Sequence, residues 1–348
     1  MYEFAKKCLR LTKLTLLYFR RIVFVKGHFK VSPLAKIRSN LGGGFLTDQY
    51  MLYGLSDASR KKEYLSEFDW YRSRYINSPY DFLLNNKVAC TQLLNPYTRV
   101  PGILAMRNRG VLSNFEEDVL DEQQVLEILR QSRDAFFKPS DKGKGSGVCR
   151  MSWDGEYRID GEVCEEKDIL EPMHRYKDWI LCETIQQGAF PASLYDQTVN
   201  TMRIITFRNV ETERFEVFFA VQRIGTRETI PVDNGSRGGL VACIDLETGE
   251  LSEARCLHNL DVHEVHPDSG AKIKGARVPG WQKLKADVLA LSRKLPYLSF
   301  IAWDIVLTDE GFAVIEANAS SGVNIIQLWG GQRQGPLGDF YRHHHVRV

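Results

Sequence analysis

The stretch IAWDIVLTDEGFAVIEAN, residues 301–318, predicts a β-hairpin that gathers three oxygen-bearing side chains. Two apolar, β-branched runs flank residues 309–311, and a three-residue loop that ends in glycine is a common hairpin connection. In such a hairpin Asp304 lies opposite Glu316, and Asn318, two residues further along, shares the face of Glu316. The pattern therefore predicts two carboxylates and one carboxamide on one face of a sheet.

The register of this hairpin depends on its loop. With three loop residues, Thr308 faces Phe312 and the two acids face each other, whereas a bulge at Gly311 would shift the pairing by one residue. In the expected register Phe312, Val306 and Val314 share the face of the acids. That face is therefore expected to be buried and not solvated.

The opposed acids predict a cation, because like charges placed across a sheet destabilise it unless a positive charge lies between them. Carboxylate and amide oxygens are ligands that Mg²⁺ prefers, and this ion keeps its other positions for water and phosphate. Asp304, Glu316 and Asn318 are thus the predicted metal ligands. The alternative is a hairpin whose acids lie at a solvated sheet edge without a ligand.

The composition limits the size and class of protein that the whole chain can form. With 348 residues, 43% of them hydrophobic, the chain is long enough for two or three lobes with cores of their own. No run of eighteen apolar residues is present, so no membrane span is expected. The seven cysteines are scattered and never occur as CxxC, which favours a reducing cytoplasm over disulfides or structural zinc.

The basic residues are concentrated at the N-terminal end. Residues 1–38 hold ten Lys/Arg against one acid, whereas the remainder holds thirty-six against forty-three. Residues 2–25 predict an amphipathic helix, because apolar side chains recur there at steps of three, four or seven. One interpretation is an in-plane anchor on an anionic membrane through residues 1–26, and the other is a helix packed on the protein body or on a second subunit.

A glycine-rich loop follows the run FFKP. Its sequence, SDKGKGSG at residues 140–147, suits backbone N–H groups that cover a phosphate. It lacks the Gly-Lys-Ser/Thr ending and the following helix of a P-loop. Two Asp-Gly pairs, at 154–155 and 160–161, predict antiparallel hairpins after it, so the loop is expected at the tip of a β-flap. A surface turn without a ligand is the alternative.

Two arginines lie within apolar strands. Arg203 is embedded in MRIITF and Arg223 in VQRI, and Arg237 follows at the tip of the loop NGSRGG. A guanidinium in a strand usually has a planar anion as its partner, either a ligand or an internal acid. Both kinds of partner remain open for these arginines.

The order of these features resembles the ATP-grasp superfamily, and within it the sugar-transfer-associated family. The most specific part is WDIVLTDEGFAVIEANAS, and SLYDQTVNTMRIITF and HPDSGAKIKG add to the resemblance, which covers roughly residues 60–340. It implies an α+β fold in which two lobes clasp ATP, with a helical N-terminal extension. The implied domains are a helical region (1–80), an N-terminal lobe (81–137), a β-flap (138–190) and a C-terminal lobe (191–348).

The resemblance also implies roles for individual residues. ATP would be bound by Lys87, Lys138, Gly145, Ser146, Gly147, Glu183, Thr184, Ile185 and Asn234, with the lysines on its phosphates and residues 183–185 on adenine. One or two Mg²⁺ would be held by Asp304, Glu316 and Asn318. D-alanine ligases carry an arginine where this chain has Ala302, so the substrate carboxylate or oxyanion would be held by Arg203, Arg223 or Arg237.

The activity implied is that of a carboxylate–amine ligase that works through an acyl-phosphate. By the family name it would belong to surface polysaccharide synthesis, and one version attaches an amino acid to a sugar or uronic acid as an amide. The alternatives are a phosphotransferase acting on a hydroxyl, or a non-catalytic ATP-binding subunit of a glycan assembly complex. Expected partners are the small-molecule substrates, a lipid-linked saccharide, an anionic membrane or a second copy, and not nucleic acid.

Overall fold

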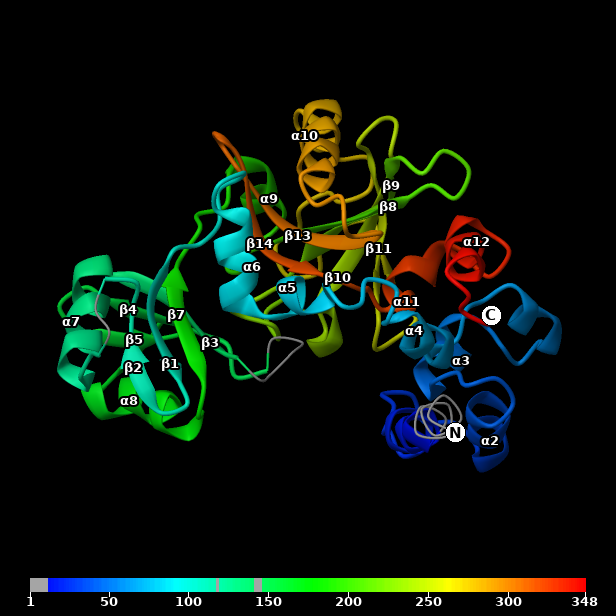
Figure 1. Ribbon diagram of the computed structural model, residues 1–348, viewed down its shortest axis with the longest axis horizontal. Helices are drawn as coiled ribbons and strands as arrows, with labels where there is room; N and C mark the ends of the chain where they lie inside the picture. Colours follow the sequence, from blue (N-terminus) through cyan, green and yellow to red (C-terminus); the bar gives the residue numbers. More distant parts are fainter. Residues whose placement is uncertain (1–11, 117–118, 141–145) are drawn as a thin grey trace.

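The computed structural model describes residues 12–116, 119–140 and 146–348, and it contains two seven-stranded antiparallel sheets (Figure 1). Helices accompany both sheets, so the predicted α+β class is confirmed. Each sheet has its own apolar core. The sheets therefore belong to two lobes, and the chain crosses between them before β1 and after β7.

The smaller lobe is built on the sheet with strand order β2-β1-β7-β3-β4-β5-β6. Its strands are β1 (Ile103–Asn108), β2 (Val111–Ser113), β3 (Asp134–Pro139), β4 (Cys149–Trp153), β5 (Tyr157–Ile159), β6 (Glu162–Cys164) and β7 (Trp179–Glu183). Helices α7 (Glu122–Ser132) and α8 (Glu166–Arg175) pack on it, and Leu126, Phe137 and Trp179 lie fully buried in the shared core. The antiparallel hairpins predicted after the glycine-rich loop are present.

One sheet thus contains strands that were expected in two units. The predicted boundary at residue 137/138 lies inside β3, whose two edges pair with β4 and β7. Helices α5 (Asp81–Asn85) and α6 (Lys87–Leu94), expected beside β1, pack instead on β14 of the other sheet. The reason is apolar packing, because Leu84, Cys90 and Leu94 are buried in the core of the larger lobe.

The larger lobe is built on the sheet with strand order β12-β11-β10-β9-β8-β13-β14. Its strands are β8 (Met202–Arg208), β9 (Phe215–Ile224), β10 (Leu240–Ile244), β11 (Leu251–Cys256), β12 (Val262–His263), β13 (Phe300–Thr308) and β14 (Gly311–Asn318). One face packs on α10 (Trp281–Arg293), and near the crossing from β7 lies α9 (Ala189–Leu194). The opposite face packs on α11 (Val323–Ile326), on the short helix η4 (Gln327–Trp329) and on α12 (Pro336–His343).

The N-terminal region lies beside the C-terminal helices, away from the smaller lobe (Figure 1). Residues 12–18 are α-helical and continue into η1 (Phe19–Val23), which confirms the predicted helix over the part that is described; residues 1–11 lie outside it. Then follow α2 (Pro33–Asn40), α3 (Thr47–Leu52), η2 (Ala58–Lys62) and α4 (Glu67–Ser73). In the described ranges we find no helix with the length and apolarity needed to cross a bilayer.

The hairpin β13–β14 has the predicted acid pair but a different loop. Asp304 is paired with Glu316 as expected, whereas Thr308 pairs with Gly311 and not with Phe312. The loop has two residues instead of three, and the surplus residue is Ile315, which bulges opposite the step from Asp304 to the next residue of β13.

This bulge changes which residues share a face. Phe312 and Val314 pack in the main core on the α10 side, so their predicted placement beside the acids is wrong. Val306 does lie on the acid face, where it packs with Ala313 and with Ile185 from the crossing segment. The acids therefore lie between two apolar clusters on one face of the larger sheet.

Candidate functional site

A row of charged side chains crosses three neighbouring strands of the larger sheet. Asp304 on β13 is paired on one side with Glu316 of β14 and on the other with Arg203 of β8. Arg203 Nε donates to Asp304 Oδ1 at 2.8 Å, and Arg203 Nη2 donates to Oδ2 at 2.6 Å. The planar anion predicted for this strand-borne arginine is thus an internal acid, held in a two-point contact.

Arg223 on β9 joins the same cluster and connects it to a second acid. Its Nη1 lies 3.3 Å from Asp304 Oδ1, and its Nη2 donates to Asp233 Oδ1 at 2.6 Å. The side chain of Asp233 is only 4% exposed, and that of Asp304 only 7%. Two guanidinium groups therefore compensate two carboxylates that are almost completely removed from water.

The pKa values follow from this arrangement. Burial opposes the charged form of Asp304, but Arg203 and Arg223 outweigh that effect and hold the pKa of Asp304 below its usual value. Burial likewise opposes the charge on Arg203, yet the nearby carboxylates, Asp304 first and then Glu316, raise the pKa of Arg203. Asp304 therefore remains an anion at neutral pH and acts as a fixed negative charge.

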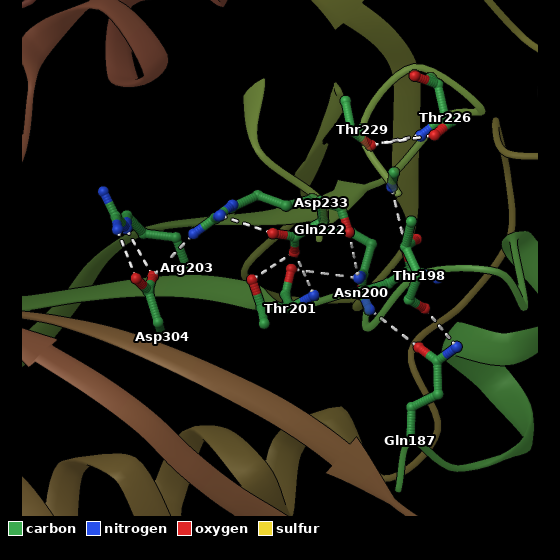
Figure 2. A network of polar contacts seen from close by, with 12 residues as sticks. Gln187, Thr198, Asn200, Thr201, Arg203, Gln222, Thr226, Thr229, Asp233 and Asp304 are labelled. Carbon is green, nitrogen blue, oxygen red and sulfur yellow. Dashed lines mark hydrogen bonds and ion pairs between the residues drawn. The ribbon is translucent and has the colours of Figure 1, made fainter. Parts of the chain in front are cut away.

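The cluster continues into a network of polar contacts toward the crossing between the lobes. Figure 2 shows Arg203 directed at Asp304, followed by Asp233, Thr201, Asn200 and Gln187. The backbone N–H and hydroxyl of Thr201 both donate to Asp233 Oδ2, at 2.6 and 2.5 Å. Asn200 N donates to Gln187 Oε1 at 2.9 Å. The segment just after β7 is thus hydrogen-bonded to the residue that precedes Thr201.

The residues predicted as metal ligands retain oxygen donors for an ion. Among the described residues, the side chains of Glu316 and Asn318 have no hydrogen bond or ion pair to another side chain or to the backbone. Asp304 receives three N–H or ion-pair contacts and keeps one lone pair on Oδ2. Two carboxylates and an amide oxygen fit the preferences of Mg²⁺.

The amide is essential to that set. Across residues 12–116, 119–140 and 146–348, no group of three His, Cys, Asp or Glu side chains is arranged to hold a metal. A metal at this hairpin therefore depends on Asn318 as the third donor. Asn318 shares the face of Asp304, because it lies two residues beyond Glu316 on β14 and is paired with Ala302, two residues before Asp304.

The two lysines predicted for phosphate binding come from different lobes. Lys87 is the first residue of α6, which is capped by the Asn86 side chain at Ala89 N, 2.9 Å. One turn later on the same helix, Cys90 lies beside Glu316, and burial raises the pKa of this thiol to about 12. Lys138 is a half-buried residue of β3 in the smaller lobe, so the predicted origin of the two lysines in separate lobes agrees with the structure.

The segment predicted to hold adenine lies where β7 leaves the smaller lobe. The carboxylate of Glu183 accepts the Gly102 N–H at 2.9 Å, and Glu183 N donates to the Gly102 carbonyl, also at 2.9 Å. These two hydrogen bonds connect the two chain segments that cross between the lobes, one before β1 and one after β7. In the described part of the chain the Thr184 hydroxyl is buried without a hydrogen-bond partner, and Ile185 packs on Val306 and Ala313.

The remaining predicted residues that the structure describes lie on two loops. Gly145 is outside the described residues, Ser146 is exposed, and Gly147 has φ +74°, where an added Cβ would lie 2.3 Å from Tyr176 Oη. Asn234 is buried, and its backbone carbonyl accepts the N–H groups of Arg237 and Gly239, which closes the loop of the short helix η3 (Gly235–Arg237).

Sequence reasoning did not identify Asp233, the acid that positions Arg223. It follows Ile230-Pro231 in a loop, and only its distant pairing with Arg223 and Thr201 reveals its role. Asn200 and Thr201 precede the strand of Arg203, and no local pattern marks them as part of the site. Their side chains make contacts far apart in sequence, which periodicity along the chain does not encode.

Comparison with protein families gives a match that covers most of the chain. Residues 68–335 match the family described as sugar-transfer associated ATP-grasp. No curated protein matches the sequence significantly. Among solved structures, N5-carboxyaminoimidazole ribonucleotide synthetase from Thermotoga maritima is 12% identical, with 79% of this chain and 48% of that chain covered and a TM-score of 0.36.

Two further solved structures have similar statistics. D-Alanine-D-alanine ligase from Helicobacter pylori is 11% identical, with 76% of this chain and 61% of that chain covered and a TM-score of 0.43. The ATP-grasp ligase PsnB, solved with a precursor peptide and AMPPNP, is 15% identical, with 86% and 72% covered and a TM-score of 0.39. The chain spans about half the length of the synthetase and under two thirds of the D-alanine ligase.

Proposed function

Because the chain belongs to the sugar-transfer associated ATP-grasp family, we propose that it is a Mg²⁺-ATP-dependent carboxylate–amine ligase. The observation that carries this proposal is the row Glu316–Asp304–Arg203, in which Asp304 is buried and its two neighbours are partly buried, with Arg223 beside it. It combines fixed negative charge, carboxylate and amide oxygens that suit a metal, and guanidinium groups on the sheet face beside the crossing between the lobes. Such a site suits a metal-bound polyphosphate next to a carboxylate.

ATP is proposed to bind on this face. Glu183, Thr184 and Ile185 are proposed to hold adenine. Ile185 packs on Val306 and Ala313, and because all three are buried they would fix the position of this segment; the Thr184 hydroxyl, which has no hydrogen-bond partner among the described residues, is a candidate polar contact. Lys87 and Lys138 are proposed to approach the phosphates from the two lobes, since an ammonium is a compact charge that suits phosphate oxygens. Gly145, Ser146 and Gly147 would cover them, with Asn234 on the opposite loop.

One or two Mg²⁺ would be held by Asp304, Glu316 and Asn318, and would supply charge neutralisation on the transferring phosphoryl group. The other charges of the proposed site come from side chains of the protein. Arg203 and Arg223 keep Asp304 ionised, and Asp233 keeps Arg223 in place. In the part of the chain that the structure describes, the Arg237 guanidinium is exposed and makes no hydrogen bond, so it is the arginine best suited to hold a substrate carboxylate.

The proposed reaction has two steps. A carboxylate oxygen of the substrate attacks the γ-phosphorus of ATP, the bond to the β-phosphate oxygen breaks, and ADP leaves. The amine of the second substrate then attacks the acyl carbon, loses a proton, and displaces inorganic phosphate. A tetrahedral oxyanion forms after the amine attacks and before phosphate leaves, and a neighbouring guanidinium would stabilise it. No protein nucleophile is required.

The substrates are proposed from the family description. A link to sugar transfer favours surface polysaccharide synthesis, in which an amino acid would be joined to a sugar or uronic acid by an amide bond. A lipid-linked saccharide would serve as acceptor for an enzyme at the inner face of a membrane. A homodimer is compatible with the same chemistry.

Hydroxylamine tests the proposed reaction. The protein is incubated with Mg²⁺, ATP, hydroxylamine and panels of amino acids and uronic acids, and ADP and hydroxamate are measured together. A ligase forms both, because hydroxylamine intercepts the acyl-phosphate. Glu316→Gln should lower both rates by about a hundredfold or more, while Glu310→Gln, in the exposed loop of the same hairpin, should leave them unchanged.

Two results would reject the ligase. ADP formed with a hydroxyl acceptor, and never any hydroxamate, would identify a phosphotransferase. ATP binding that is equal in the parent and in Glu316→Gln, without ADP from any substrate pair, would identify a non-catalytic subunit. A mass shift of the product distinguishes an amide from a phosphate ester.

A further inference from the structure

The N-terminal helices expose an unusual concentration of large apolar side chains. Six residues between positions 16 and 41 are 44–75% exposed, and they come from two neighbouring helices and the segments that follow them. They are Leu16, Phe19, Phe24, Leu34, Ile37 and Leu41. We call these six residues the apolar end surface. The rest of the described chain, more than three hundred residues, contributes twelve such side chains.

The helices are fixed to the body by their other sides. Ile22 is buried, its carbonyl accepts the Asn40 Nδ2–H at 3.0 Å, and the Tyr18 hydroxyl donates to the Asn40 carbonyl. The Tyr18 ring also packs edge-on against Phe68 of α4, with centroids 4.8 Å apart. The predicted packing of this helix on the protein body is therefore correct for one side of the helix.

The exposed side is a separate surface. Leu16 precedes Tyr18 by two residues, which places it about 200° around the helix from Tyr18. On α2, Leu34, Ile37 and Leu41 follow one another at steps of three and four, so they form one stripe, while Ser39 and Asn40 are buried. Packing on the body thus orients the two helices and leaves their apolar stripes uncovered.

Basic side chains accompany these stripes, and the segment that carries them contains no acid of its own, although Asp48 of α3 contacts His28. Residues 12–41 contain seven Lys/Arg and no Asp or Glu. The seven are Lys13, Arg20, Arg21, Lys26, Lys30, Lys36 and Arg38, and all of them are exposed. An apolar stripe flanked by exposed positive charge is the arrangement of helices that lie in the plane of an anionic membrane.

We propose that the apolar end surface docks on a bilayer rich in anionic phospholipids, with helix 12–23 and α2 both lying in its interface. A second copy of the chain is a poorer occupant, because a two-fold contact through this surface would oppose seven positive charges with seven more. This inference adds α2 to the surface first expected in residues 1–26. It concerns location and does not depend on the proposed reaction.

Vesicle cosedimentation of the full chain tests the inference. The vesicles are phosphatidylcholine alone, or phosphatidylcholine with phosphatidylglycerol, at low and at high salt. Binding is expected only with the anionic lipid and should weaken as salt rises. Leu34→Ser/Ile37→Ser should weaken it roughly a hundredfold, at about tenfold for each lost apolar contact. Lys36→Gln/Arg38→Gln should weaken it roughly thirtyfold, at about fivefold for each charge.

A matched control distinguishes vesicle binding by this surface from nonspecific binding by exposed apolar side chains elsewhere on the protein. Val163→Ser/Leu260→Ser removes two apolar side chains that are exposed to the same extent elsewhere, and should bind vesicles like the parent. Unfolding temperatures of all variants should be unchanged, since exposed substitutions cost little. Absence of parent binding, or equal loss in the control, overturns the inference. So does a parent dimer, seen by sedimentation, that Leu34→Ser/Ile37→Ser converts to monomer without any vesicle binding.

Discussion

Asp304 is the residue at which the charges of the site meet. It touches two guanidinium groups on one side and faces Glu316 on the other, so a change at this position acts on both neighbouring strands. A charge that is almost fully buried remains ionised only because its partners are buried with it. Stability and site chemistry therefore rest on the same contacts.

Asp304→Asn should lower the free energy of unfolding by about 3 kcal/mol at neutral pH, because it leaves the buried Arg203 without its two-point partner. Urea denaturation measures the change. Asp287→Asn, which removes an exposed partner of Lys283 on α10, is the control and should cost less than about 1 kcal/mol. Equal losses in the two variants would contradict a special role for the Asp304 pairing.

The same carboxylate should make the parent protein sensitive to acid. A pKa held below its unfolded value stabilises the fold above about pH 4, and this contribution is lost as the pH falls through the lower, folded value. Unfolding measured between pH 7 and pH 2 should therefore show an acid-dependent loss that is smaller in Asp304→Asn. Identical pH profiles of parent and variant would rule out this contribution.

Among the connecting elements, the turn that enters β4 has little room for a side chain at Gly147. Gly147 has positive φ, and an added Cβ would meet the Tyr176 hydroxyl and Pro139. Gly147→Ala should cost at least about 2 kcal/mol and weaken ATP binding, because both the backbone and the contact are unfavourable. Gly155→Ala, also at positive φ but in open space, is the matched control and should cost about 1 kcal/mol. Calorimetry and nucleotide titration measure both effects, and equal costs would contradict the steric argument.

For the strands and hairpins, the sequence predicts which residues pair, but it does not predict where a turn or a bulge takes up an extra residue. The acid pair of the hairpin was predictable from residue spacing, and so were the antiparallel strands after the glycine-rich loop. The bulge at Ile315 was not, because a third loop residue and a bulged residue add the same count between Asp304 and Glu316. The choice between them depends on packing against Ile185 and the α10-side core, which is a tertiary effect.

Over the whole molecule, the two lobes have separate cores connected by two crossings. The core of the smaller lobe includes Leu126, and the main core of the larger lobe includes Leu298, both fully buried. Leu126→Ala should lower only the unfolding transition of the smaller lobe, and Leu298→Ala only that of the larger one, each by about 2–5 kcal/mol. Calorimetry tests this, and a single transition shifted equally by both variants would show that the lobes unfold as one unit.

The whole-molecule arrangement was predictable in class but not in detail. Resemblance along the chain predicted the family and two lobes, and the family match agrees. It did not predict that helices α5 and α6 pack on β14, nor that Asp233 supports Arg223. Both depend on contacts between residues far apart in sequence, and these become visible only when the chain is folded.

The bulge at Ile315 also separates the register of the hairpin tip from the register of the acid pair. If the surplus residue moved from position 315 to the loop, residues 311–314 would rotate by half a turn while Asp304 stayed opposite Glu316. Ala313 would then leave the cluster with Ile185, and the larger Val314 would take its side of the sheet. Such a slip would place a larger side chain against Ile185 without disturbing the charged row. The packing that supports the segment proposed to hold adenine is thus set independently of the proposed metal ligands.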